Sequence, residues 1–242
     1  MVQSFVAIDV ETTGLSPDKY HIIEVGALKV RDGEVVETFS SLINPGYELS
    51  STIVNLTGIT DSMLSGAKSF KEVAEELRTF LGEETLLGHN VSFDYRFLKT
   101  EFMRAGYKFD HPVIDTLAIA RQMHSDLKSR SLENLCRHYG LYNPNAHRAF
   151  DDAKVTMELY FAMMKNGERG IKEVAGLDQL ANPGSYSYKI KKDSPITPRQ
   201  KNYLIDLMKY HKIDNVQQVE KLTKREASRM IDQIIFEKGR IQ

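Results

Sequence analysis

The sequence predicts a mixed α/β domain followed by a small, basic helical module. Strand-like and helix-like runs follow one another along residues 1–167, as the spacing of apolar residues changes from alternation to helical periodicity. The charge also changes along the chain: residues 1–184 have a net charge of −7 and residues 185–242 a net charge of +6. An acidic body with a basic tail indicates two modules. We therefore expect a domain over 1–167, a linker over 168–196 and a basic helical module over 197–242.

The composition is ordinary for a globular protein: 41% of the 242 residues are apolar and 27% are charged. No apolar run approaches the length of a membrane span, and the first residues lack a secretory signal, so we expect no membrane partner. The single cysteine, Cys136, cannot form an intrachain disulfide and favours a cytoplasmic location. Because Cys136 lies in a helix-like stretch, we expect a buried, unreactive thiol.

Five strands are expected. The run 5–10 is apolar on both faces, which is typical of a central, covered strand. Runs 22–30 and 35–43 flank the turn Arg31-Asp32-Gly33 and should form a hairpin. Two shorter apolar runs, 86–88 and 113–115, complete the set.

Helices are expected where apolar residues recur at helical spacing. Residues 70–81 have this pattern clearly. Further helices are expected over 92–104, 116–124, 131–139 and 150–165. In the tail, Thr197 and Thr223 each begin a capping box, which predicts two helix starts. These helices should cover the faces of the sheet in the first domain and form a compact unit of two or three helices in the tail.

Asp9 and Glu11 are unusual because they end an apolar strand and point to the same face. Two like charges at such a place are unfavourable unless a cation lies between them. Asp94 and Asp152 each open a helix, where an acid alone can simply complement the helix dipole. His147 lies on the loop before the second of these helices, where a histidine alone is usually solvated.

Proteins that bind hard divalent cations bring oxygen ligands together from distant segments of the chain. These acids, with the histidine near the last of them, follow that pattern. Carboxylates without cysteine ligands favour Mg²⁺ or Mn²⁺ over Zn²⁺. Two such ions can promote displacement at phosphorus by activating water and stabilising the leaving oxygen. We therefore expect the cation that lies between Asp9 and Glu11 to be a metal ion.

Three stretches of the chain resemble the exonuclease motifs of the DEDDh 3′→5′ exonuclease family: DVETTGL at 9–15, HNVSFDYRFL at 89–98 and HRAFDDA at 147–153. VNLTGIT at 54–60 and PVIDTLAIAR at 112–121 resemble further segments of that family. The resemblance covers about residues 1–167 and is closest to bacterial proofreading exonucleases of DNA polymerase III. It implies a ribonuclease H-like mixed sheet of five strands flanked by helices, with 1–167 as the exonuclease domain.

The resemblance also implies a role for each residue of the constellation. Asp9, Glu11, Asp94 and Asp152 would hold two Mg²⁺ or Mn²⁺ ions, with Asp9 bridging them. His147 would be the general base for the attacking water, which is reasonable because the ordinary pKa of histidine lies near neutrality.

Substrate contacts are likewise implied by the resemblance. Backbone and side chains after the first two acids would lie against the terminal nucleotide, and Phe93 would stack on a base, although it could equally be a core ring. The residues expected to contact substrate are Thr12, Thr13, Gly14, Leu15, His89, Asn90 and Phe93.

We expect a two-metal 3′→5′ exonuclease that releases nucleoside 5′-monophosphates from single-stranded or frayed DNA ends during proofreading or repair. An exoribonuclease of the oligoribonuclease type is the first alternative, because the motifs do not report how a 2′-hydroxyl is read. An inactive nucleic-acid-binding scaffold is the second.

The tail departs from the family pattern. Its cations can contact phosphates, with binding that weakens steeply in salt. They can equally form a solvated surface, pack on the catalytic domain, or dock a polymerase or a replication or repair protein. These cations are Lys191, Lys192, Lys201, Lys209, Lys212, Lys224, Arg225 and Arg229.

Overall fold

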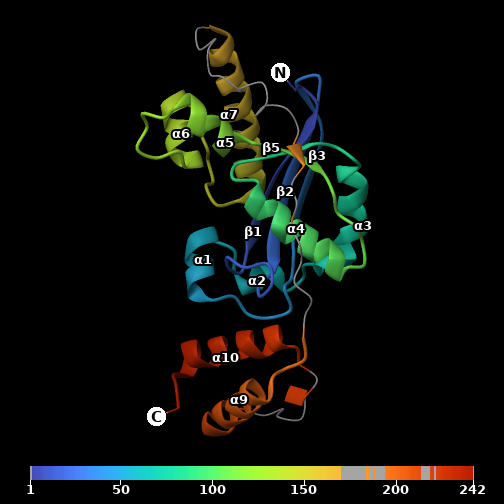
Figure 1. Cartoon of the computed structure of the whole chain (residues 1–242), viewed down its shortest axis with the longest axis vertical. Helices are drawn as coiled ribbons and strands as arrows, with labels where there is room; N and C mark the ends of the chain where they lie inside the picture. The colour runs from blue at the N-terminus through green and yellow to red at the C-terminus, as the bar shows by residue number, and fades with distance from the viewer. Residues whose placement is uncertain are drawn as a thin grey trace. The chain divides into compact units, whose positions relative to one another are not determined.

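The computed structural model describes residues 2–169, 184–185, 188, 194–213, 219–220 and 222–241 (Figure 1). The chain divides into two compact units, residues 1–188 and 189–242. Lys191, Lys192 and most of the predicted linker lie outside the described residues.

A mixed sheet forms the centre of the first unit. Its strand order is β3-β2-β1-β4-β5-β6. β1 pairs antiparallel with β2 and parallel with β4, while β4 and β5 are also parallel. The predicted mixed sheet of five strands is thus confirmed, and a two-residue sixth strand adds to its edge. The strands are β1 (Phe5–Thr12), β2 (Ile22–Arg31), β3 (Glu34–Leu42), β4 (Leu86–Gly88), β5 (Pro112–Asp115) and β6 (Gly184–Ser185).

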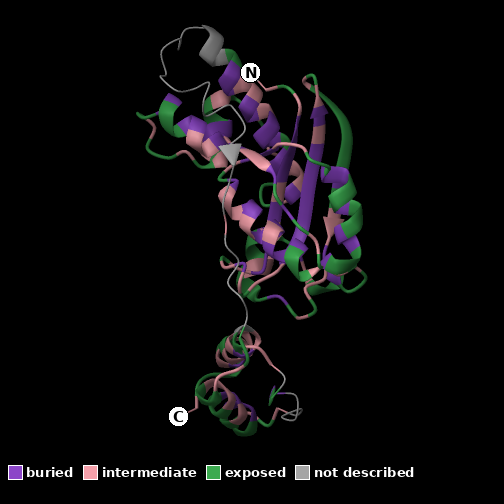
Figure 2. Cartoon of the chain, turned by 45° about the vertical axis from the view of Figure 1, so that its right-hand side comes forward, coloured by how far each residue is buried: buried purple, intermediate pink, exposed green. Residues whose placement is uncertain are grey.

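β1 is covered on both faces, as its apolar run predicts. Val6, Ile8 and Val10 belong to one core cluster, and Phe5 and Ala7 belong to another. The buried colour of the central strands is visible in Figure 2. β1 continues two residues past the predicted end, because Glu11 pairs with Glu24 and, after a shift in register, Thr12 pairs with Ile22.

Helices cover the two faces separately. α3 and α4 contribute side chains to the first cluster, and α5, α6 and α7 contribute to the second. The first-unit helices are α1 (Ser51–Thr57), α2 (Asp61–Leu64), α3 (Phe70–Leu81), α4 (Ser92–Arg104), α5 (Thr116–Met123), α6 (Leu132–Tyr139) and α7 (Ala149–Arg169). Five of these lie where helical spacing predicts them, whereas α1 and α2 are additional. Cys136 is buried, as expected.

The second unit contains α9 (Pro198–Tyr210) and α10 (Lys224–Lys238). Both predicted capping boxes are present, at Thr197 and Thr223. Leu204, Leu207 and Ile234 lie in its small core. In the part of the chain that the structure describes, no helix is long and apolar enough to cross a membrane.

Candidate active site

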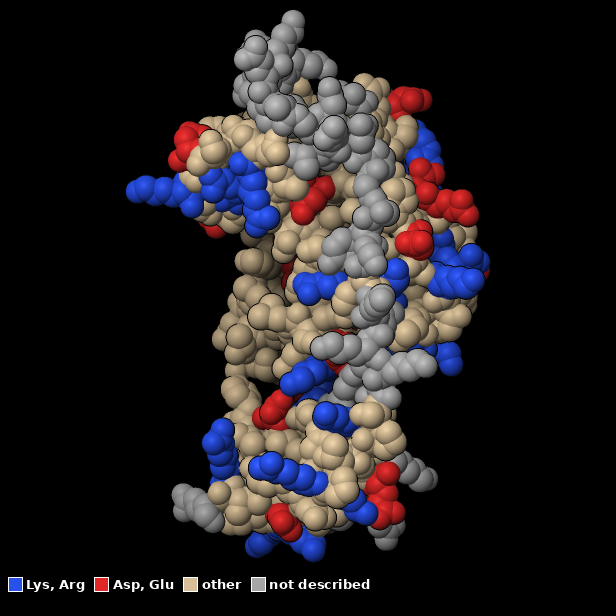
Figure 3. All heavy atoms as spheres, in the orientation of Figure 1, with Lys and Arg blue, Asp and Glu red and all other residues tan. Residues whose placement is uncertain are grey.

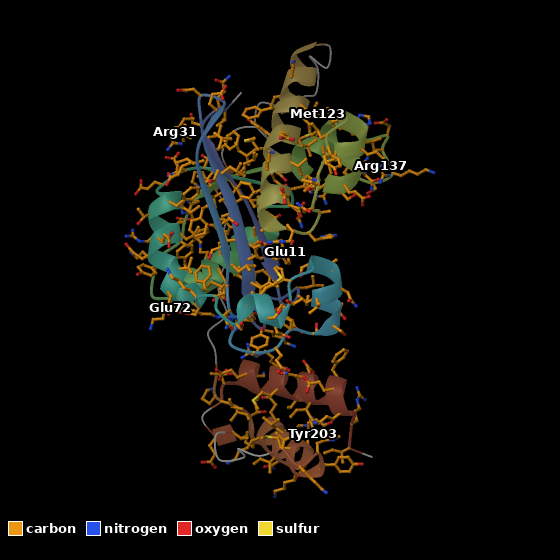
Figure 4. The ribbon with its side chains drawn as sticks, turned by 180° about the vertical axis from the view of Figure 1, so that it is seen from behind. Glu11, Arg31, Glu72, Met123, Arg137 and Tyr203 are labelled. Atoms are coloured by element: carbon orange, nitrogen blue, oxygen red, sulfur yellow. The ribbon has the colours of Figure 1, made fainter. Side chains whose placement is uncertain are left out.

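The first two acids lie on β1, in register with β2. Asp9 is opposite Gly26, and Glu11 is opposite Glu24. Glu11, labelled in Figure 4, lies near the end of the strand and is partly buried. The alternation of side chains along β1 therefore directs both carboxylates to the face that α7 covers.

Asp94 reaches the same strand from α4. It is the third residue of that helix and only 3% exposed. The backbone N–H of Val10 donates to its Oδ1 atom over 3.1 Å. Val10 lies between the two strand acids in the sequence, so this bond fixes the third carboxylate beside them. Asp94 thus accepts a hydrogen bond from another element, whereas an acid that only complements the helix dipole needs no such contact.

Asp152 and His147 come from the start of α7 and the loop before it. The backbone N–H of His147 donates to Oδ2 of Asp152 over 3.1 Å, and Nδ2 of Asn143 donates to Oδ1 over 2.5 Å. His147 has a left-handed backbone, with φ of 64°, and an exposed side chain. Potential ligand atoms of Glu11, His147 and Asp152 all lie within 4.8 Å of one another.

The four acids are electrostatically coupled. Burial raises the pKa of Asp9 well above its ordinary value, and repulsion from Asp94 and Asp152 raises it further. Burial raises the pKa of Glu11 to about 8, with repulsion from Asp152 adding to it and Arg148 opposing it. Burial also raises the pKa of Asp94 to about 7 and that of Asp152 above its ordinary value. Such shifts mark a site that is short of positive charge.

Arg148, the cation that opposes this repulsion, forms an ion pair with Glu24. Its Nη2 lies 2.7 Å from Oε1 of Glu24, and its Nε lies 3.1 Å from both carboxylate oxygens. The backbone N–H of Ala149 also donates to Glu24, over 3.0 Å. Glu24 is only 2% exposed. The pair therefore ties the start of α7 to β2, immediately after His147.

Gly26 brings α7 against the sheet at the same place. A Cβ atom on Gly26 would lie 2.1 Å from the backbone nitrogen of Phe150, which is closer than real contacts allow. Neither Gly26 nor Glu24 was among the residues predicted from the sequence. A signal for Glu24 was present, because it is a lone acid in the apolar run IIEVGAL.

The predicted substrate residues after Glu11 form a compact turn. The Thr12 hydroxyl donates to the carbonyl oxygen of Gly14 over 2.8 Å, and the Thr13 hydroxyl lies 2.6 Å from that of Tyr47. A Cβ on Gly14 would meet the Tyr20 ring at 2.6 Å. Leu15 is 82% exposed. An apolar side chain held out from an ordered turn is available to contact a nucleotide base.

The second predicted group shows a different arrangement. His89 uses both ring nitrogens within the protein, at 2.9 Å from the Thr116 hydroxyl and 2.9 Å from the Arg130 carbonyl oxygen. Burial lowers its pKa. These contacts leave its ring face, but not its nitrogens, for a substrate.

Asn90 lies on the turn before α4, and Phe93 is the second residue of that helix. Asn90 has a φ of 63°, and its N–H donates to Asp115 over 2.8 Å. Phe93 is partly buried and lies 4.9 Å, centroid to centroid, from the ring of Phe97. Phe93 thus packs on the core through one side and is accessible in part, so stacking on a base stays a prediction.

The donor set fits hard divalent cations. Carboxylates from three separate segments repel one another electrostatically, and Arg148, the cation that opposes this at Glu11, is paired with Glu24. Mg²⁺ and Mn²⁺ prefer such oxygen ligands. Glu11, Asp152 and His147 form a group able to hold one ion.

A family model and several known proteins are similar to this chain. The RNase_T exonuclease family model matches residues 6–160. A PolC-type DNA polymerase III from Halalkalibacterium halodurans is 42% identical over 177 residues, which are 73% of this chain and 12% of the polymerase. The chain therefore spans only about 12% of the length of such relatives.

Solved structures share the fold. Exonuclease X in complex with 5′-overhanging duplex DNA matches with a TM-score of 0.56 and 25% identity, covering 71% of this chain and 98% of that one. Exonuclease I of E. coli in complex with a dT13 oligonucleotide matches with a TM-score of 0.62 and 21% identity, covering 71% of this chain and 43% of that one. Since the family model matches more than half of the chain, residues 6–160 form a DEDDh exonuclease segment and the protein belongs to that exonuclease family.

Proposed function

We propose that this protein is a metal-dependent 3′→5′ exonuclease that hydrolyses the terminal phosphodiester bond of a DNA strand and releases a nucleoside 5′-monophosphate. The observation that carries the proposal is the convergence of four coupled carboxylates with His147. Membership of the exonuclease family supports the reaction class.

Each residue has a proposed part in the reaction. Asp9, Glu11, Asp94 and Asp152 would hold two Mg²⁺ or Mn²⁺ ions. When bound, these ions would supply Lewis-acid stabilisation of the phosphate and lower the pKa of the attacking water. His147 would accept the proton of that water. The water oxygen would form a bond to phosphorus as the bond from phosphorus to the 3′ oxygen of the preceding nucleotide breaks, and that oxygen would take up a proton from solvent to become the 3′ hydroxyl.

The position of His147 supports its proposed role. Its side chain is exposed, so water and substrate can reach it, while its backbone is held by Asp152. The left-handed backbone at this residue is unfavourable for a histidine and is maintained by the contacts around it. A base held at a fixed distance from the acids is what proton transfer requires.

DNA is the proposed substrate. The complexes of Exonuclease X and Exonuclease I with DNA support this choice, and the similarity to PolC-type polymerases supports a role in replication or repair. An RNA substrate is the competing possibility. DNA and RNA oligonucleotides of one sequence, labelled at the 5′ end, separate the two. Faster shortening of the RNA would overturn the preference.

The decisive variant is Asp9→Asn. We expect wild-type protein to shorten the labelled strand stepwise with Mg²⁺ but not with EDTA, and the variant to leave it intact. Asp126→Asn, an exposed acid after α5, is the matched control and should act like wild type. Normal digestion by Asp9→Asn would refute the assignment of the site.

A further inference from the structure

The two helices of the C-terminal unit run in the same direction, so both end at one edge. At their starts, Nε2 of Gln200 donates to the carbonyl oxygen of Lys224 over 2.9 Å and to the Ser228 hydroxyl over 2.8 Å. At their ends, Nε2 of His211 donates to the carbonyl oxygen of Gly239 over 3.0 Å. The last turn of α9 therefore lies beside the last turn of α10.

This edge combines cations with exposed aromatic rings. Tyr210 is 52% exposed and Phe236 is 64% exposed. We define the end patch as the exposed cations and aromatic rings at the two helix ends: Lys209, Tyr210, Lys212, Phe236, Lys238 and Arg240. Figure 3 shows Lys and Arg side chains spread over the C-terminal unit.

The cations are available to a ligand. Among the described residues, no acid forms an ion pair with any of the four cations of the end patch, whereas Lys201 is paired with Glu220 at 2.5 Å. One acid, Glu237, lies between patch residues in the sequence and accepts a hydrogen bond from Gln233. Helix dipoles explain why lysines gather at helix ends. They do not explain two large rings left in water beside them.

Cations interleaved with exposed rings suit a single strand of nucleic acid. The cations match phosphates, and a flat ring stacks on any unpaired base. In a duplex the base faces are covered by their neighbours, so the rings would have no partner. We propose that the end patch binds single-stranded DNA as a second contact, separate from the catalytic acids. The choice of DNA over RNA rests on the proposed function, whereas the choice of a single strand rests on the patch itself.

Binding is measured on the full chain in EDTA, where the strand is not hydrolysed, by fluorescence anisotropy of labelled 15-nucleotide oligo-dT. The variant Tyr210→Leu/Phe236→Leu keeps apolar area but removes both flat rings. We expect its dissociation constant to rise by about tenfold or more. Both positions are exposed, so the urea unfolding midpoint should not change. Equal binding by this variant and wild type would overturn the proposal.

A charge variant and a matched control test the phosphate contacts. Lys238→Gln/Arg240→Gln should reduce the slope of log affinity against log salt by about 1.4, at ~0.7 for each phosphate contact to a single strand. Arg199→Gln/Lys224→Gln removes two exposed cations from the opposite edge of the same unit and should leave the slope unchanged. Equal loss in both variants would mean that only net charge matters, and would also overturn the proposal.

Two further arms identify the ligand and separate this proposal from the proposed function. The ring variant should also bind oligo-rU of the same length more weakly than wild type does. Its affinity for blunt duplex DNA should equal that of wild type. Hydrolysis of the p-nitrophenyl ester of thymidine 5′-monophosphate reports the catalytic site alone and should be unchanged in every end-patch variant. If wild type fails to cleave this ester, the proposed function fails. If ester cleavage is normal and the ring variant binds oligo-dT normally, only the end-patch proposal fails.

Discussion

The replacement Arg148→Met tests the buried ion pair that holds α7 on the sheet. Glu24 is 2% exposed and accepts hydrogen bonds from Arg148 and from the backbone of Ala149. Without the guanidinium, a buried carboxylate would keep a single backbone donor. Breaking a buried pair on one side costs about 3–5 kcal/mol. We expect the lower end, about 3 kcal/mol, because the Arg148 side chain is 39% exposed and water can partly replace it.

Replacement of the other member of the pair, Glu24, should cost less stability. Glu24→Gln keeps an oxygen acceptor for the N–H of Ala149 and removes a charge that repels Glu11 and Asp9. We expect a cost of about 1 kcal/mol, and nearly the same cost for the double variant, since no charge is then left buried. The coupling energy of the cycle should therefore be about 3 kcal/mol in size, because the double variant costs about 3 kcal/mol less than the two single variants together.

Hydrogen exchange with mass spectrometry on the metal-free full chain provides the measurement. The opening free energies of peptides from β2 and α7 report the exonuclease unit without interference from the second unit. Arg137→Met is the matched control, because Arg137 (labelled in Figure 4) pairs with Glu133 on an exposed helix surface, where such pairs contribute about 0.3–0.5 kcal/mol. The reasoning is refuted if Arg148→Met lowers the opening free energy no more than Arg137→Met does.

Three further predictions follow from the same region. Gly26→Ala should destabilise the exonuclease unit by about 3 kcal/mol in urea unfolding, because the added Cβ would overlap the backbone of Phe150. Gly66→Ala is the control: the space around Gly66 is open, so this replacement should change stability by less than about 0.5 kcal/mol. In EDTA the melting temperature should fall as pH rises from about 4.5 to about 8: the folded-state pKa of Glu11 is raised from 4.5 to about 8, so the folded state binds more protons in that window, and Mg²⁺ should flatten the curve. His147→Gln should slow DNA hydrolysis by about 10²–10⁴-fold while Mn²⁺ binding, measured by calorimetry, stays within a few-fold of wild type; a comparable loss of Mn²⁺ affinity would instead make His147 a metal ligand.

Local patterns predicted the regular elements well. The apolar spacing over 70–81 and 92–104 gives the bounds of α3 and α4 as the structure has them. α1 and α2 were missed because they have only seven and four residues and lack a wide apolar stripe. Their signals are the capping side chains of Ser50 and Thr60.

The candidate site was partly accessible from the sequence. Carboxylates that interrupt or end apolar runs are conspicuous, so Asp9 and Glu11 could be selected from the residue pattern alone. The pair Glu24–Arg148 could not, because its members are 124 residues apart and no local pattern links them. The left-handed backbone of His147 was equally hidden, since it depends on the bond to Asp152 and on the seating of α7. Tertiary packing decides such features.

α7 begins at the proposed metal-binding acids and continues as a major element of the core. Asp152 lies in its first turn, and Leu159, Tyr160 and Met163 further along are fully buried. α7 thus carries both a proposed metal ligand and several residues of the hydrophobic core. If α7 moved far enough to displace Asp152 from the other acids, the hydrophobic core would have to open as well. Heat inactivation of hydrolysis and calorimetric melting of the exonuclease unit should therefore coincide, without a folded but inactive form between them.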